Sequence, residues 1–436
     1  MRVLTRLLRW ILEVDHPLPT WGEPERLAYQ RRWLRWNFTV NVLEGAAFWF
    51  GMSFASFGTI LPLFISKLTD SKLALGAAGA IAGAGWALPQ LFTANYVERL
   101  ARKKAVVVNL GFFTERLPIW LFPLAALVAG SHPGLALALV LAGEAGHCLG
   151  AGVVATGWQD MLANCFPVDV RGRLLGLMVF IGAGAGLLGA KLSAWLLATY
   201  PFPTNFALTF ALGALGIGGS FVLLALTREP VQPQLKPRQT HREFFATLPA
   251  LVRADPNLRA FLTARVLMVL GGMGYAFLTV SAIQRFGLPD SAAAWFTAAS
   301  LAGQMLGNLA CGLIADRRGH KWTMQVGVSA AAVAYALAAL APSAGWYHVV
   351  FFLLGVASGA YFVSGILLVL ELAIPERRAT YVGLVNTTVG LVGVLGPLLG
   401  AALARAGYGW VFALGALCQA AGVAVLTLRV REPRDG

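Results

Sequence analysis

Charged residues are scarce in this chain. Asp, Glu, Lys and Arg make up 12% of its 436 residues, roughly half the share found in soluble domains. This scarcity excludes an ordinary soluble protein. Mean hydropathy is +0.69, and long apolar runs recur along the chain, as in transmembrane helices. The runs are continuous in Ala, Leu and Gly, whereas a transmembrane β-barrel needs strands of alternating hydrophobicity. The sequence therefore predicts an all-α membrane protein.

The chain is also poor in groups that form disulfides or bind metals. Its four cysteines and six histidines are dispersed, and no Cys-x-x-Cys, Cys/His or HExxH spacing links them. These spacings argue against a disulfide framework, a metal centre and the clustered site of a membrane enzyme. We expect the cysteines to be small buried residues, and we predict that the protein uses no cofactor.

Twelve apolar segments are long enough to cross a bilayer. They are 37–65, 73–95, 105–130, 134–163, 172–199, 204–227, 257–283, 291–315, 321–341, 345–374, 379–406 and 409–429. Of the 34 Lys and Arg residues, 27 lie in the termini and loops on one side, and 4 lie in the loops on the other. Because basic residues stay on the cytoplasmic side, both termini are predicted to be cytoplasmic, in the inner or plasma membrane. Topology then explains the net charge of +14, and no nucleic acid partner is expected.

The twelve segments divide into two groups of six, separated by a basic, proline-rich stretch that has the composition of a linker. The predicted parts are a cytoplasmic amphipathic N-terminal segment at 1–36, a bundle at 37–227, a cytoplasmic linker at 228–256 with a short surface helix near 240–253, a second bundle at 257–430, and a cytoplasmic tail at 431–436. At the start of the chain, arginines lie opposite leucines at helical spacing. This pattern is typical of a helix at the membrane surface.

The two halves resemble each other. The stretch 97–104 aligns with 315–322 at an offset of 218, and 171–190 aligns with 378–397 at an offset of 207. Each match alone is weak, but the two fall in corresponding places and the linker lies at the midpoint. Internal repeats in a helical membrane protein are typical of secondary transporters.

The stretch GLIADRRGHKW at 312–322 resembles the signature G-x-L-x-D-R-x-G-R-K of the major facilitator superfamily. The positions that match it are Gly312, Asp316, Arg317, Gly319 and Lys321. In the first half, 97–104 is a degenerate copy, in which Glu98 replaces Asp and Ala101 replaces Gly. The segment GVLGPLLG at 393–400 resembles the Gly-Pro motif of many exporters in the family. The resemblance implies two pseudo-two-fold-related six-helix bundles around a central cavity lined by spans one, four, seven and ten. It also implies secondary transport by alternating access.

Charged residues cluster where the predicted cytoplasmic ends of the halves meet. The resemblance implies that such clusters bridge the halves while the cytoplasmic side is closed. The candidate gating charges are Glu98, Arg99, Asp160, Arg171, Arg173, Asp316, Arg317, Glu371 and Arg378. We hypothesise that Asp316 and Arg171 latch the outward-open state, and that Glu98 and Arg378 form the equivalent latch by the repeat. The alternative is that the basic residues only hold their loops inside, which does not explain Asp316.

Ionisable residues inside the spans mark function by default, because a charge within the bilayer is costly. Asn41 and Glu44 share one face of the first span, and Arg265 lies in the seventh span at an offset of 221 from Glu44. This offset is close to that of the repeat. We therefore expect Glu44 and Arg265 to lie at similar depth, to face the cavity, and either to pair or to bind substrate. A fixed ion pair without a role in transport is the alternative.

A second group of ionisable residues lies in spans three and four, namely Glu115, Arg116, Glu144 and His147. Glu144 and His147 are three residues apart and share a helix face. A carboxylate beside a histidine could carry a coupling proton, because histidine titrates near neutral pH. They occupy what looks like the place of an Arg-x-x-Gln-Gly pattern in many proton-coupled exporters of the family. The alternative is that Glu144 neutralises Arg116 or Lys191.

Small residues recur in spans five and eleven, where we expect close helix packing. The packing residues are Gly186, Gly189, Gly393, Gly396 and Pro397. The sequence thus predicts a monomeric, proton-coupled secondary transporter in the lipid bilayer, exporting a small amphipathic or apolar molecule. A carrier of a small polar or anionic metabolite, held by Arg265 or Lys191, is the alternative within this class. An integral membrane enzyme or a channel is the alternative outside it, although a channel has no use for a two-fold repeat and paired latches.

Overall fold

The computed structural model describes residues 6, 10–13, 18–97, 99–232, 251–373 and 378–432. These residues form helices and connecting turns, with no β-strand among them. The predicted all-α membrane fold is therefore confirmed. The predicted amphipathic helix at the N-terminus and the linker helix near 240–253 fall almost entirely outside the described residues.

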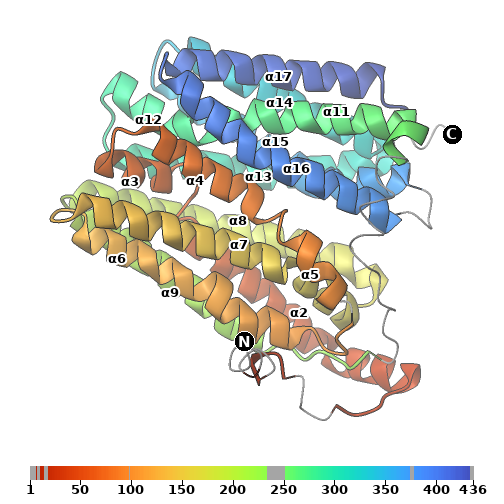
Figure 1. The fold of residues 1–436 in the computed structure, drawn as a ribbon. Helices are drawn as coiled ribbons and strands as arrows, with labels where there is room; N and C mark the ends of the chain where they lie inside the picture. Colours follow the sequence, from red (N-terminus) through yellow and green to blue (C-terminus); the bar gives the residue numbers. More distant parts are fainter. Residues whose placement is uncertain are drawn as a thin grey trace.

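The two halves lie one above the other in Figure 1, and each is a bundle of long, roughly antiparallel helices. The elements of the first half are α2 (Glu23–Met52), α3 (Ile60–Leu68), α4 (Lys72–Gly85), α5 (Gln90–Val97), η1 (Ala105–Leu110), η2 (Phe112–Arg116), η3 (Leu117–Trp120), α6 (Leu121–Val128), α7 (Pro133–Cys165), α8 (Val168–Thr199) and α9 (Thr204–Ala225). The elements of the second half are α11 (Pro256–Gly271), η4 (Gly272–Gly274), α12 (Tyr275–Phe286), α13 (Ser291–Arg318), α14 (His320–Leu340), α15 (Gly345–Leu372), α16 (Arg378–Ala404) and α17 (Tyr408–Leu428).

These elements form twelve helical segments, which match the predicted spans in order. We call each segment a rod, whether it is one helix or several helices in succession. By length and composition, nine helices in the described part of the chain are apolar enough to cross a membrane, and Lys72–Gly85 and Gly345–Tyr361 are shorter apolar helices. The remaining rod is the first, which consists of α2 and α3. The basic first half of α2 lowers the mean hydropathy of this rod. The chain is thus a multi-pass membrane protein.

The first and seventh rods are interrupted, which the sequence did not predict. The helix α2 begins at Glu23, well before the predicted start at 37, because Glu25 accepts a hydrogen bond from the backbone N–H of Gly22 and caps it. It ends at Met52, and α3 resumes only at Ile60. In the second half, η4 tightens the backbone between α11 and α12. Interruptions in membrane helices are tolerated only where neighbouring groups satisfy the freed backbone.

The third rod departs from α-helical geometry in its first half. Both η1 and η2 are π-helical, with wider turns than an α-helix. The neighbouring helix α7 lies against this segment with no room for side chains. A Cβ on Gly150 would lie 2.0 Å from the carbonyl oxygen of Thr114. π-Helical turns are rare and often occur at functional sites.

Successive rods alternate in direction, so the molecule has two ends. We call the end with residues 99–104 and 226–232 the linker end. We call the other end, with the turns at 69–71, 287–290 and 405–407, the far end. Figure 1 shows α3 and α4 of the first half beside α12 of the second half at the far end, as their contacts require.

Two pairs of helices make the most extensive contacts between the halves: α4 packs on α16, and α8 packs on α13. A Cβ on Gly83 would lie 3.1 Å from the carbonyl oxygen of Gly393, and one on Gly186 would lie 2.9 Å from the Leu301 side chain. The repeat relates these two contacts, because the offset of 218 takes Gly83 to Leu301 and the offset of 207 takes Gly186 to Gly393. The same helix contact is therefore made twice, once by each half.

The other packing residues of spans five and eleven lie in similarly close contacts. A Cβ on Gly189 would lie 2.1 Å from Oγ of Ser53, the residue that follows α2. One on Gly76 would lie 2.8 Å from the carbonyl oxygen of Pro397, and Gly396 lies close to α11. Small residues in these positions let the helix backbones approach each other closely.

Candidate functional site

At the far end, the interruption of the first rod packs directly on the second half. The carbonyl oxygen of Gly58 accepts a hydrogen bond from Thr279 Oγ1 at 3.0 Å, and a Cβ on Gly58 would lie 2.3 Å from the ring of Tyr275. The next residue, Thr59, is hydrogen-bonded through its hydroxyl to the hydroxyl of Thr297, and both are buried. A residue larger than glycine at position 58 would therefore force the halves apart.

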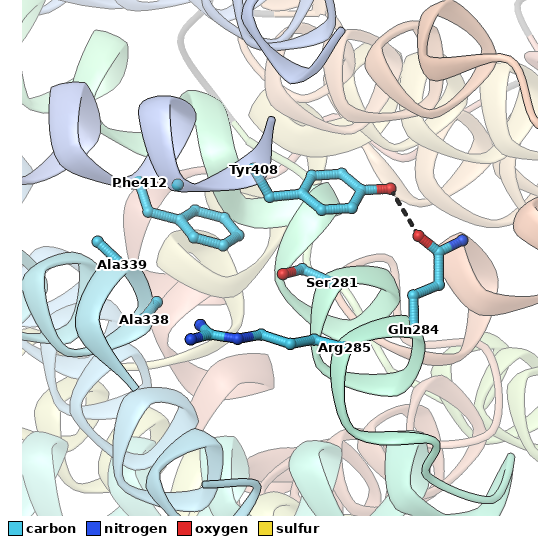
Figure 2. A pocket seen from close by; sticks show the side chains of 8 residues that line it. Ser281, Gln284, Arg285, Ala338, Ala339, Tyr408 and Phe412 are labelled. Atoms are coloured by element: carbon cyan, nitrogen blue, oxygen red, sulfur yellow. Dashed lines mark hydrogen bonds between the residues drawn. The ribbon is translucent and has the colours of Figure 1, made fainter. Parts of the chain in front are cut away.

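Two lysines add polar contacts between the halves nearer the surface. Lys67 Nζ lies 2.7 Å from Asp290 Oδ1. Lys72 Nζ donates to the Tyr408 hydroxyl at 2.6 Å, and that hydroxyl donates to Gln284 Oε1 at 3.1 Å. Figure 2 shows Tyr408 and Gln284 beside a pocket of about 470 Å³ in the second half. The far end is thus closed by side-chain contacts that can separate without unfolding either half.

A group of buried charges lies within the first half, where α2, η2 and α9 meet. Arg116 Nη2 lies 3.8 Å from Glu44 Oε1 and 3.7 Å from Glu115 Oε1, and Arg116 Nη1 donates to Ser220 Oγ at 3.3 Å. Its guanidinium carbon is also 5.0 Å from the ring centroid of Phe48. One arginine therefore compensates two buried carboxylates, and it is held by an aromatic face as well.

Glu144 and His147 lie next to this group on α7. His147 Nδ1 is 3.0 Å from the carbonyl oxygen of Glu115, and its ring is 5.6 Å from the ring of Phe57. Glu144 is 1% exposed. Its Oε2 atom has no hydrogen-bond partner and the carboxylate makes no ion pair within the described part of the chain. A buried carboxylate without a partner is unusual, because its ionised form is strongly disfavoured away from water.

Comparisons with known proteins agree with this architecture. The sequence profile of the Major Facilitator Superfamily matches residues 261–436. A mutant of the nucleoside transporter NupG has a TM-score of 0.69 at 13% identity, covering 91% of this chain and 100% of that one. The profile match covers the second half of the chain, and the likeness of fold extends over nearly all of it.

Other solved structures share the fold over nearly the whole length of this chain. A D-xylose–proton symporter has a TM-score of 0.67 at 13% identity, with 92% of this chain and 98% of that chain covered. A bacterial homologue of the human lysosomal transporter Spinster, in an inward-facing and unoccupied conformation, has a TM-score of 0.56 at 17% identity, with 94% and 96% covered. A sequence search of curated proteins finds no match.

The predicted pairing of Glu44 with Arg265 is wrong in this structure. The polar face of α2 turns into its own bundle, where Asn41 Nδ2 donates to the Asn37 carbonyl oxygen and to Thr227 Oγ1. Glu44 lies on the same face and pairs with Arg116 instead. The alternative in which Glu144 neutralises Arg116 or Lys191 is also wrong, because Arg116 contacts Glu44 and Glu115 while Lys191 is exposed. Asn41 and Glu44 are therefore internal groups of the first bundle.

Arg265 lies in the second bundle without such compensation. Its Nε atom is buried and has no hydrogen-bond partner among the described residues, and the same is true of the Tyr361 hydroxyl. The two side chains, from α11 and α15, are close enough to interact electrostatically. Within the described part of the chain, they leave a buried donor and a buried hydroxyl unpaired on two helices of the second bundle.

The predicted gating charges are only partly described. Glu98 and the side chains of Asp316 and Arg378 lie outside the described residues. Arg171 donates from Nε to the Phe166 carbonyl oxygen at 2.9 Å and from Nη2 to the Ala163 carbonyl oxygen, so it binds the C-terminus of α7. The remaining four predicted gating residues lie at the linker end, with Arg173 and Arg317 exposed, Arg99 just after α5, and Asp160 in the last turns of α7.

The sequence analysis missed a contact of the ninth gating residue, Glu371. Its Oε1 atom lies 3.9 Å from His320 Nε2, and His320 Nδ1 is 3.1 Å from Ser364 Oγ. The signature loop is therefore tied through its histidine to the end of α15. The family signature has a basic residue at this position, which was the available signal.

Proposed function

We propose that this protein is a secondary active transporter of a small molecule that works by alternating access, with the linker end in the cytoplasm. The observation that supports this most strongly is the far-end closure. There, residues of the two repeat-related halves meet through hydrogen bonds and an ion pair, with no covalent link. Under the positive-inside orientation, the closed end is extracellular, and the conformation described is the inward-facing one.

We further propose that transport is coupled to a proton and that Glu144 carries it. A carboxylate that is buried and unpartnered in one conformation, and wetted in another, takes up and releases a proton as the pathway opens and closes. His147 lies one helical turn away on α7 and contacts the carbonyl oxygen of Glu115. The protein is expected to act as a monomer, since the alternating contacts lie within one chain.

For the substrate, an amphipathic or apolar molecule fits a pathway with few unpaired charges. One observation favours the second candidate, a small polar or anionic metabolite. Arg265 Nε and the Tyr361 hydroxyl, on α11 and α15, are buried and lack hydrogen-bond partners among the described residues. Such groups would bind a carboxylate or phosphate well. Arg265 is thus the residue that separates the two substrate classes.

We expect the purified protein in proteoliposomes to accumulate at least one compound against its gradient when a pH gradient is imposed. The panel contains amphipathic cations, nucleosides, sugars and small carboxylates, and a protonophore should abolish the accumulation. Arg265→Met should abolish uptake of an anion but leave uptake of an apolar cation unchanged. If no compound exceeds its uptake by protein-free liposomes, the proposal of secondary transport fails.

A further inference from the structure

The start of the linker is bound into the first bundle through a buried carboxylate. Glu229 is 3% exposed. Its oxygens accept the backbone N–H of Lys103 at 3.0 and 2.9 Å and that of Lys104 at 2.8 Å, directly before η1 begins. Asn164 Nδ2, at the end of α7, lies 3.4 Å from the same carboxylate. The carboxylate therefore caps the N-terminus of the third rod, where the helix dipole favours an anion.

The residues next to Glu229 bind the first rod and the same loop. The backbone N–H of Arg228 donates to Asn37 Oδ1 at 2.8 Å, and the carbonyl oxygen of Arg228 accepts from Asn37 Nδ2 at 2.9 Å. The backbone N–H of Gln232 donates to the Ala101 carbonyl oxygen at 3.0 Å. The end of the sixth rod is thus tied to the middle of α2 and to the 99–104 loop.

The second bundle repeats part of this arrangement. The triplet Arg-Glu-Pro occurs at 228–230 and again at 431–433, in both cases just after the last rod of a half. The backbone N–H of Arg431 donates to Asn257 Oδ1 at 2.8 Å, as that of Arg228 does to Asn37. The Glu432 carboxylate lies 2.8 Å from the place that a Cβ on Gly319 would occupy, in the signature loop.

The sequence offsets agree with this equivalence. Asn37 and Asn257 are separated by 220 residues, close to the offset of 218 that relates the 99–104 loop to the signature loop. Gly319 has a backbone φ of +86°, a conformation that L-residues rarely adopt. Glycine at position 319 therefore allows both the positive φ of the turn and the close approach of the Glu432 carboxylate.

We propose that Glu229 and Glu432 are positioning residues of two equivalent clamps. Each clamp holds the loop after the second rod of its half against the end of the sixth, so that the linker-end charges on that loop can meet the other half. The first clamp is formed by Glu229 with Asn37, and the second by Glu432 with Asn257. The role of the clamps in the transport cycle rests on the proposed function, whereas their existence as local structures does not.

The cost of burying an ionised carboxylate indicates that Glu229 does more than stabilise the fold. Burial raises the pKa of Glu229 above its ordinary value, and the N–H groups of Lys103 and Lys104 offset only part of this effect. Buried charges are weak sources of stability, and their best-attested use is to fix one arrangement against others. A clamp that sets the position of the gating loop is such a use.

Hydrogen–deuterium exchange on the full-length protein tests the clamps without any substrate. Glu229→Gln is expected to speed exchange of the amides at 103–106 about tenfold, because Gln turns an N–H donor toward groups that need an acceptor. Exchange at 319–324 should stay unchanged. Glu432→Gln should give the reverse pattern. Asp70→Asn removes an exposed far-end carboxylate and should change neither segment.

Two further variants distinguish a local effect of the substitution from misfolding of the whole protein. Glu229→Asp keeps an acceptor and should show a smaller change at 103–106. Asn37→Ala removes only the bonds to Arg228 and should speed exchange around that residue. Unchanged exchange at 103–106 in Glu229→Gln, or an equal rise throughout the protein, would overturn the first clamp.

Cysteine labelling tests the positioning role. Thr59 is 1% exposed in the closed far end, so Thr59→Cys, in a Cys418→Ser background, reacts with a membrane-impermeant maleimide only when the far end opens. Glu229→Gln should slow this labelling about fivefold, a typical size for conformational coupling. Unchanged or faster labelling would contradict the positioning role. If Thr59→Cys is never labelled in the otherwise wild-type chain, alternating access fails, while the exchange experiment still decides whether the clamps exist.

Discussion

Replacing Arg116 with methionine is expected to destabilise the protein by about 3 to 5 kcal/mol, the usual cost of removing one partner from a buried ion pair. The guanidinium is the only cation that contacts Glu44 and Glu115 among the described residues. Without it, two carboxylates remain close together inside the membrane. Methionine keeps most of the volume against Phe48, so the loss reports the charge rather than a cavity.

The measurement is the melting temperature of the purified protein in detergent, which is monitored as the loss of the folded fraction on heating. Lys191→Met is the matched control, since Lys191 is an exposed cation on α8 and its loss should have little effect. Adding Glu44→Gln to Arg116→Met should recover part of the stability, because the double variant leaves one buried carboxylate instead of two. An unchanged melting temperature in Arg116→Met would mean that the cluster does not exist as described.

Glu144→Gln is expected to abolish accumulation driven by a pH gradient while leaving exchange of substrate across the membrane intact. Glutamine has nearly the same shape but cannot bind and release a proton. Exchange under equal concentrations needs the conformational change but no net proton movement, so it separates coupling from folding. The assay compares both fluxes in the same proteoliposomes.

Glu23→Gln serves as the control for this experiment, because Glu23 lies on the surface at the start of α2 and pairs with Arg26. It should leave both fluxes unchanged. Glu44→Gln is the informative comparison, since Glu44 already has a cation beside it and is expected to be less important for the proton. If Glu144→Gln and Glu44→Gln both retain full pH-driven accumulation, neither group carries the proton.

Most of the fold could be predicted from the sequence, because long apolar runs determine where the chain crosses the membrane and basic loops determine its orientation. The repeat offsets even relate the Gly83–Gly393 contact to the one between Gly186 and Leu301. Those glycines contact the other half because small residues are needed wherever helix backbones meet closely. Such a pattern is visible without a structure.

The partners of the buried charges could not be predicted in the same way. The helical period of α2 correctly placed Asn41 and Glu44 on one face, but it cannot say which neighbour that face meets. Arg116 lies in a π-helical segment, whose wider turns rotate the side chains away from the positions that an α-helical period assigns. The offset of 221 between Glu44 and Arg265 reflects the repeat and not a contact.

The interruption of the first rod and the Arg-Glu-Pro clamps illustrate two further limits. A glycine such as Gly58 contributes to no hydrophobic or polar pattern in the sequence. Its role, the close approach to the second half, depends on Tyr275, more than 200 residues away. The repeated triplet at 228–230 and 431–433 was visible in the sequence. Its meaning depends on backbone N–H groups, which every residue except proline supplies, so the partner cannot be read from residue types.

The most direct test of alternating access is a reversible disulfide across the far end. The hydroxyls of Thr59 and Thr297 meet between the halves, and both side chains are short enough for cysteines in their places to bond. Thr59→Cys with Thr297→Cys, in a Cys418→Ser background, should therefore form a disulfide when oxidised. We predict that this disulfide stops gradient-driven flux, that a reductant restores it, and that neither single cysteine variant responds to oxidation. Full flux through a completely crosslinked protein would contradict the account, because the far end would then not need to open.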